Sequence, residues 1–266
     1  MAKVLFLLSV LPLGLIAQAH DSVWRSDFGR MAEGIYKIQT APLRWKGHDW
    51  IKFGGVFLVT AAMTQADQPI RNFAQAGRCD FMEGVNNVGY HYGKAYSAVA
   101  LTGGFYLTGL AFKNEWARET GVALGTGLAS ASILSMGLKP LIGRARPSRN
   151  MGNQEIRYFS NDPDFHSFPS GHTTVAFTAS FILAKRVKSV PLKIGFYSLA
   201  ATTAACRLYS DAHWISDIAF GGAIAWFCSE AAIRSLEGNK YRIKKPRKVD
   251  WNVSPYYTGL SFRGTF

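Results

Sequence analysis

Two long uncharged runs place the tightest limit on how this chain of 266 residues can fold. Ala95 to Phe112 and Thr120 to Leu138 each hold about eighteen residues, enough for a helix that crosses the core of a bilayer. The second run also carries small residues on one helical face, which let a neighbouring helix approach closely: Gly121 and Gly125, four residues apart, continued by Ala129 and Ser132. Closely packed apolar helices are therefore the expected framework.

Three later uncharged runs are shorter, and each reaches spanning length only if its end residues stand in water or among lipid headgroups. They are Thr173 to Ala184, Ile194 to Cys206 and Ile218 to Ser229. Ile51 to Met63 has only about thirteen residues and suits a helix that does not cross. We therefore predict an all-α fold, a membrane-embedded helical bundle of about six core helices with the functional site at one end.

The N-terminal region differs from this centre. Residues 1–19 contain Lys3, an apolar core and the cleavage pattern Ala17-Gln18-Ala19, which together predict a signal peptide cleaved before His20. An uncleaved anchor helix is the alternative. Residues 20–92 predict an amphipathic and loop region with one non-spanning helix.

The rest of the chain divides into two parts. Residues 93–235 are the predicted helical bundle that carries the functional site. Residues 236–266 form a basic and aromatic tail. Its last residues alternate in strand fashion and end in Phe266, as in the closing strand of an outer-membrane barrel. One strand cannot close a barrel, so a short hairpin or a disordered tail is expected.

Charge indicates the kind of partner. Lys and Arg total 30 against 17 acidic residues, so anionic partners are expected. No recognisable nucleic-acid motif is present, and a phosphorylated lipid at a bilayer surface fits better. The segments 113–119, 185–193 and 240–248 all carry Lys or Arg and would share one face, which the positive-inside rule makes cytoplasmic. The functional site would then face the periplasm.

The turn Phe168 to His172 is built to hold an oxyanion. Ser170 is a favourable N-cap residue, Gly171 permits close approach of a ligand, and the following uncharged run predicts a helix whose positive end faces the anion. Three cations, Lys139, Arg146 and Arg207, lie at the ends of apolar helices. Charges in such places are expected to meet an anion.

His213 and Asp217 are four residues apart on a predicted helix that Asp211 can cap, so they are expected to share one face. A carboxylate bonded to one ring nitrogen fixes the tautomer and leaves the other nitrogen free to attack. His213 is therefore the expected nucleophile.

Taken together, these residues form three blocks whose order and spacing resemble the signature of the type 2 phosphatidic acid phosphatase and vanadium haloperoxidase superfamily. The blocks are Lys139-x6-Arg146-Pro147, Pro169-Ser170-Gly171-His172 and Arg207-x5-His213-x3-Asp217. One position departs, since Cys206 stands where the family usually has Ser. The resemblance covers roughly residues 95–233.

The resemblance implies a metal-independent phosphatase without cofactor that acts on a lipid phosphomonoester or diphosphate through a phosphohistidine. It implies the following roles: His213 as nucleophile, Asp217 as its orienting residue, His172 as general acid and then base, and Lys139, Arg146, Ser170, Gly171 and Arg207 as the phosphate-binding residues. Candidate substrates are phosphatidate, phosphatidylglycerol phosphate, undecaprenyl diphosphate and lipid A. The expected location is the inner membrane.

Alternatives stay open at this point. A soluble periplasmic acid phosphatase of the same superfamily would use the same residues, and a haloperoxidase would hold vanadate in place of phosphate. A protein that binds anionic lipids without catalysis would tolerate the loss of His213. The sequence does not indicate an oligomeric state.

Overall fold

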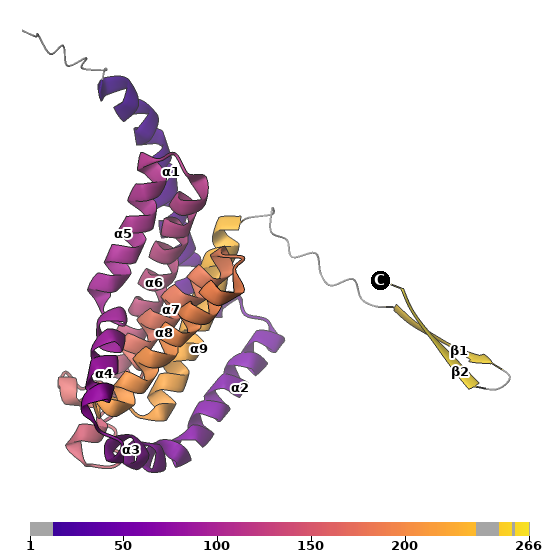
Figure 1. Ribbon diagram of the computed structural model, residues 1–266. Coiled ribbons are helices and arrows are strands. Elements are labelled where there is room, and N and C mark those ends of the chain that lie inside the picture. The colour runs from indigo at the N-terminus through magenta and orange to yellow at the C-terminus, as the bar shows by residue number, and fades with distance from the viewer. Residues whose placement is uncertain (1–12, 238–249, 257–258, 266) are drawn as a thin grey trace, which may run out of the picture.

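The computed structural model describes residues 13–237, 250–256 and 259–265 (Figure 1). The long helices are α1 (Leu13–Gln39), α2 (Gly47–Met63), α5 (Ala95–Ala111), α6 (Glu115–Ile142), α7 (Gly171–Arg186), α8 (Val190–Tyr209) and α9 (Ile215–Glu237). The shorter ones are α3 (Asp67–Ala76), α4 (Asp80–Tyr92) and the 3₁₀ turns η1 (Ala41–Arg44), η2 (Thr64–Ala66), η3 (Pro147–Arg149) and η4 (Pro163–Phe165). The prediction of an all-α helical bundle is confirmed.

The C-terminal tail contains a two-stranded antiparallel hairpin. Strand β1 (Asp250–Tyr256) pairs with β2 (Gly259–Thr265), and Asp250 lies opposite Thr265. The alternating pattern of the tail therefore forms the short hairpin, one of the two outcomes expected from the sequence.

Helices α6, α7 and α9 pack together at the centre of the bundle, with α5 against α6 and α8 against α7. Leu124 and Ile182 are fully buried in this core. Burial of each such side chain stabilises the fold by about 1.5–3 kcal/mol. Buried threonines of α6 satisfy their hydroxyls within the helix, as Thr126 does by donating to the Val122 carbonyl at 2.9 Å.

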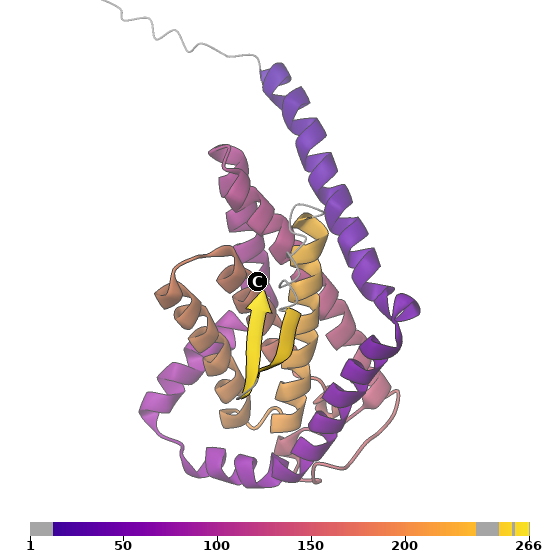
Figure 2. The same ribbon diagram turned by 90° about the vertical axis from the view of Figure 1, so that its right-hand side faces the viewer.

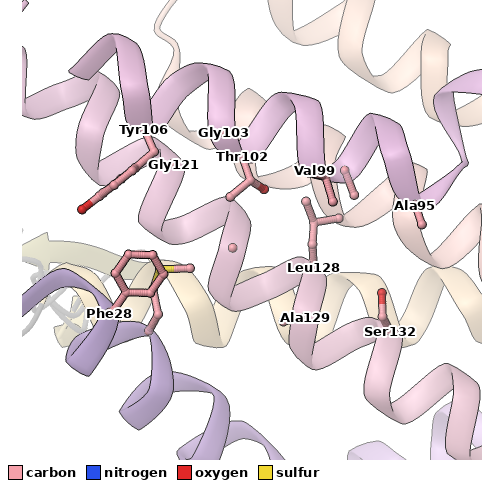
Figure 3. Close-up of a pocket in the computed structure, with 13 residues that line it drawn as sticks. Phe28, Ala95, Val99, Thr102, Gly103, Tyr106, Gly121, Leu128, Ala129 and Ser132 are labelled. Carbon is pink, nitrogen blue, oxygen red and sulfur yellow. The ribbon is translucent and has the colours of Figure 1, made fainter. Parts of the chain in front are cut away.

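Small residues on α6 allow its neighbours to approach closely, as predicted. A Cβ atom added to Gly121 would lie 2.7 Å from Tyr106 of α5, and one added to Gly125 would lie 2.1 Å from Met31 of α1. Beside these contacts, an apolar pocket of about 430 Å³ opens between α1, α5 and α6. Figure 3 shows Phe28 of α1 facing Tyr106 across it.

Apolar side chains are exposed on several helices. In the described part of the chain, α6 is the one helix whose length and apolar composition suffice to cross a membrane. On α5, Val99 is 72% and Leu107 is 64% exposed. On α2, Leu58 is 69% exposed. Apolar surface of this extent is typical of contact with lipid or with another protein.

Helix α1 runs without a break across the predicted cleavage position between Ala19 and His20, and cleavage stays a prediction. Figure 2 shows the start of α1 extending beyond the bundle. At the opposite end of the bundle, α6 and α8 end and α7 and α9 begin. Gly143 ends α6 with a φ of 62°, and an added Cβ would lie 1.7 Å from the Arg157 carbonyl oxygen. Only glycine fits this turn.

Candidate active site

The three sequence blocks meet at the end of the bundle that is drawn at the bottom of Figure 1. The Lys139 ammonium group donates to the carbonyl oxygens of His166 at 2.8 Å and Pro169 at 2.9 Å. The Ser170 backbone N–H donates to the Asp217 carbonyl at 3.1 Å. Direct contacts therefore join the first block to the second and the second to the third.

The start of α7 presents backbone N–H groups to this site. Ser170 is the N-cap residue, but its side chain does not cap the backbone, because its hydroxyl pairs with that of Thr173 at 2.9 Å. The first N–H groups of α7 therefore lack a capping side chain, an arrangement that suits an anion. A Cβ atom added to Gly171 would lie 3.5 Å from Lys139 Cε, so the helix start faces the lysine.

Two buried polar groups beside this helix start have no hydrogen-bond partner in the described residues. They are Nε and Nη2 of Arg207, in the last turn of α8, and Nε2 of His172. Arg207 is only 4% exposed. Burying a charge without a partner lowers the stability of a protein by about several kcal/mol. Arg207 and His172 therefore fit an anion that enters from outside the chain. Arg146 is half-buried, and its Nε donates to the Pro163 carbonyl at 3.0 Å.

Tyr90 of α4 is a site residue that the sequence did not reveal. Its ring stacks on the His172 ring with a centroid separation of 5.3 Å. The guanidinium carbon of Arg207 lies 5.0 Å from the Tyr90 ring centre, and Lys94 Nζ lies 4.2 Å from it. The imidazole and two cations therefore surround the Tyr90 ring. The polar segment that contains it, residues 65–92, was expected to be a loop with short helices.

His213 lies in the loop before α9 and not on the helix, so the predicted shared helical face is wrong. Its Nδ1 is 2.6 Å from the Ser167 carbonyl oxygen and 3.9 Å from Asp217 Oδ2. The expected direct bond to the carboxylate is therefore replaced by a bond to a backbone carbonyl. The predicted cap is wrong as well, because Asp211 accepts two hydrogen bonds from Arg71, both at 2.7 Å.

Asp217 acts on His213 through Ser167. Its Oδ2 accepts the Ser167 hydroxyl at 2.5 Å and the Trp214 backbone N–H at 2.9 Å. Its Oδ1 accepts Nη1 of Arg144 at 2.6 Å. The carboxylate thus fixes the residue whose carbonyl accepts the Nδ1 proton of His213.

Arg144 and Asp67 complete this arrangement, and both were missed. Nη2 of Arg144 donates to Asp67 Oδ2 at 2.6 Å, and both side chains are buried. Asp67 comes from the start of α3, far away in the sequence. The available signal was an arginine two residues before Arg146 and an aspartate in an otherwise uncharged turn, and each is common on protein surfaces.

The surroundings of His213 favour its neutral form. Burial, which has the largest effect, and the charges of Lys139 and Arg146 together lower the pKa of His213 to about 4, although Asp217 opposes them. With Nδ1–H donated to Ser167, the lone pair of Nε2 is free at neutral pH. A neutral imidazole beside an anion-binding site has the chemistry of a nucleophile on phosphorus.

Cys206, the departure from the family pattern, faces α4. It is buried, and its Sγ lies 3.5 Å from the Val85 carbonyl oxygen of α4. A Cβ atom added to Gly89 would lie 2.4 Å from that sulfur. Within the described residues, no group of three or more His, Cys, Asp or Glu side chains is arranged to hold a metal ion.

Comparisons with known proteins show what this chain is similar to. The family model described as the PAP2 superfamily matches residues 120–241. The chain is 25% identical over 269 residues to a lipid A 1-phosphatase of Porphyromonas gingivalis, an alignment that covers 92% of this chain and 54% of that protein. It is 36% identical over 121 residues to a lipid A 1-phosphatase of Rhizobium etli, covering 42% of this chain and 49% of the relative. The chain thus spans about half the length of these curated relatives.

A solved structure with a similar fold is that of a transmembrane PAP2-type phosphatidylglycerolphosphate phosphatase from Bacillus subtilis. The TM-score is 0.55 at 20% identity, and the match covers 73% of this chain and 96% of that chain. At this level of identity the likeness shows the fold.

Proposed function

Because the family model of the PAP2 superfamily matches residues 120–241 of this chain, we propose that the protein is a membrane phosphatase that removes a phosphate from a lipid phosphomonoester or diphosphate. The observation that carries the proposal is the pair of buried groups without hydrogen-bond partners in the described chain, Arg207 and His172, beside the start of α7. A phosphoryl group supplies the acceptors that they lack. The lipid A 1-phosphatases among its relatives make lipid A the first substrate to test.

The proposed reaction has two transfers. Nε2 of His213 attacks phosphorus, the bond to the leaving oxygen breaks, and His172 protonates that oxygen. His172 then takes a proton from water, the water oxygen attacks the phosphohistidine, and phosphate leaves as the bond to Nε2 breaks. Throughout, Lys139, Arg146 and Arg207 stabilise the charge on the phosphoryl oxygens, together with the N–H groups at the start of α7.

The lipid part of the proposal is supported by apolar surface beside the site. A second apolar pocket of about 330 Å³ includes Leu138 and Phe220 in its wall. Leu138 precedes Lys139, and the Phe220 ring packs on Phe168 with a centroid separation of 4.8 Å. An acyl chain can therefore find apolar contacts close to the phosphate.

We also propose that the protein lies in the inner membrane with its site facing the periplasm, that residues 1–19 are a signal peptide, and that residues 93–235 are the catalytic bundle. Mass spectrometry of the purified protein tests the signal peptide. A cleaved signal peptide leaves His20 as the first residue, whereas an uncleaved anchor leaves the chain whole. Osmotic shock tests the soluble alternative, since a soluble periplasmic enzyme is released and an embedded one needs detergent.

The function is tested by phosphate release from protein purified in detergent, with chelator present. Lipid A, phosphatidate, phosphatidylglycerol phosphate, undecaprenyl diphosphate and one soluble aryl phosphate form the substrate panel. We expect release from at least one lipid, and we expect His213→Ala to reduce it by more than about a thousandfold without unfolding the protein. Release that survives in His213→Ala contradicts the nucleophile assignment. Activity on the aryl phosphate alone favours the soluble acid phosphatase.

A further inference from the structure

Asp67 is a buried carboxylate that the proposed reaction does not use directly. It is 1% exposed, and its Oδ2 accepts hydrogen bonds from Nη2 of Arg144 at 2.6 Å, the Ser216 hydroxyl at 2.9 Å and the Asn153 amide at 3.2 Å. Its Oδ1 accepts the Ser216 backbone N–H at 3.0 Å. Four donors thus fix both oxygens of one carboxylate.

Arg144 joins Asp67 to Asp217. One guanidinium nitrogen donates to Asp217 at 2.6 Å and the other to Asp67 at 2.6 Å. Two carboxylates therefore share a single cation, which leaves one net negative charge in a buried cluster. Replacing such a cluster by apolar residues often leaves a protein as stable or more stable, so stability alone does not account for it.

The cluster leads to the nucleophile. Asp217 accepts the Ser167 hydroxyl at 2.5 Å, and the Ser167 carbonyl accepts Nδ1–H of His213 at 2.6 Å. When Nε2 attacks phosphorus, positive charge develops on the imidazole. If Asp67 were neutral, Arg144 would cancel the charge of Asp217 and the cluster would no longer oppose that positive charge.

We propose that Asp67 is a positioning residue for His213, and that it acts by neutralising Arg144 so that Asp217 keeps its charge for the nucleophile. The inference rests on the proposed function. It gives α3 a part in the reaction although α3 lies outside the residues that the family model matches. Other contacts from α3 support this placement, because Arg71 pairs with Asp211 and Gln75 donates to the Leu208 carbonyl at 2.8 Å, close to His213 along the chain.

The test compares two anions that bind the same site differently. Orthovanadate forms a bond to the nucleophilic nitrogen, whereas inorganic phosphate binds by charge and hydrogen bonds. Calorimetry on the full chain in detergent gives both dissociation constants for the wild type, Asp67→Asn and the control Asp80→Asn, an exposed carboxylate at the start of α4. His213→Ala provides the reference that lacks the nucleophile.

We expect Asp67→Asn to reduce the preference for vanadate over phosphate by about tenfold to a hundredfold. Losses of this size are typical when a residue that orients a metal-ligating histidine is removed, and we expect the same for a nucleophilic histidine. In turnover assays kcat falls by a similar factor while KM stays within about threefold. Asp80→Asn should match the wild type. An unchanged preference in Asp67→Asn, equal weakening of both anions, or a wild type that binds vanadate no better than phosphate would each overturn the inference.

A second pair of variants covers the case in which Asp67→Asn does not fold. Asp67→Glu and Asp67→Gln have the same shape and differ in charge, and we expect only Asp67→Glu to keep the preference for vanadate. Equal loss in both contradicts a role for the charge. Because anion binding needs no lipid turnover, a wild type that prefers vanadate but hydrolyses none of the lipids would refute the proposed function and not the role of Asp67.

Discussion

Two neighbouring regions of the site each contain a buried arginine, and these arginines differ in their hydrogen-bond partners. In the nucleophile network, which consists of Asp67, Arg144, Asp217, Ser167 and His213, Arg144 donates to two carboxylates and the Asn153 carbonyl. In the anion-binding region, which consists of Arg207, His172 and the start of α7, no described residue accepts from Nε or Nη2 of Arg207. The first region is complete before a substrate arrives, and the second needs an anion to complete it. Two buried arginines can therefore have different roles: Arg144 orients other side chains, and Arg207 is available to bind an anion.

The largest expected effect is on stability, and it follows the loss of Arg144 from the nucleophile network. Arg144→Gln leaves two buried carboxylates without their cation, so we expect the free energy of unfolding to fall by about 3–5 kcal/mol. Denaturant or thermal unfolding in detergent measures it. The control is Arg149→Gln, because Arg149 is 48% exposed in its ion pair with Asp164. We expect that change to stay within about 0.5 kcal/mol. Similar stability of the two variants would contradict the distinction between the regions.

Arg207→Gln should show the reverse behaviour. It removes a buried cation that has no hydrogen-bond partner in the described chain, so the free energy of unfolding should stay the same or rise. Catalysis should suffer, because a donor to the developing charge is lost, and we expect kcat/KM to fall by about a hundredfold to a thousandfold. Unfolding and phosphate release are measured on one preparation. A strongly destabilised Arg207→Gln would place Arg207 in the nucleophile network.

The pH dependence of stability tests the lowered pKa of His213. The unfolded chain binds a proton at the ordinary pKa of 6.5, whereas the folded chain does so only near pH 4. The unfolded state therefore holds more protons between these values, and stability that is complete above pH 6.5 falls by about 3 kcal/mol as the pH drops to 4. Melting temperatures of the wild type should decline more steeply over this window than those of His213→Gln. Parallel declines would contradict the depressed pKa.

The smallest expected effect concerns Cys206. Because its sulfur faces the Val85 carbonyl of α4, Cys206→Ser should change kcat/KM by less than about twofold and stability by less than about 1 kcal/mol. Phosphate release and unfolding check both values. A large change in activity with unchanged stability would mean that this side chain contacts the anion-binding region.

The sequence predicted the long helices well, because long uncharged runs must be buried or face lipid, and a helix satisfies their backbone hydrogen bonds. The runs that begin at Ala95 and Thr120 became α5 and α6, and the three shorter ones became α7, α8 and α9, each longer than its uncharged core. The segment 65–92 was expected to be a loop with short helices, and those helices are α3 and α4. Their polar composition concealed that they cover the site, where Arg71 and Tyr90 make their contacts.

By itself, the sequence determined the helical class and the three blocks of site residues, because hydrophobic length and spacing along the chain are local properties. Only the tertiary structure decided which partners these residues meet. It replaced the expected bond between His213 and Asp217 by one through Ser167, and it brought Asp67 to Arg144 from 77 positions away. Side chains so distant in sequence become neighbours only when helices pack. The pairing of the buried Asp67 carboxylate with Arg144 therefore depends on how α3 packs in the fold.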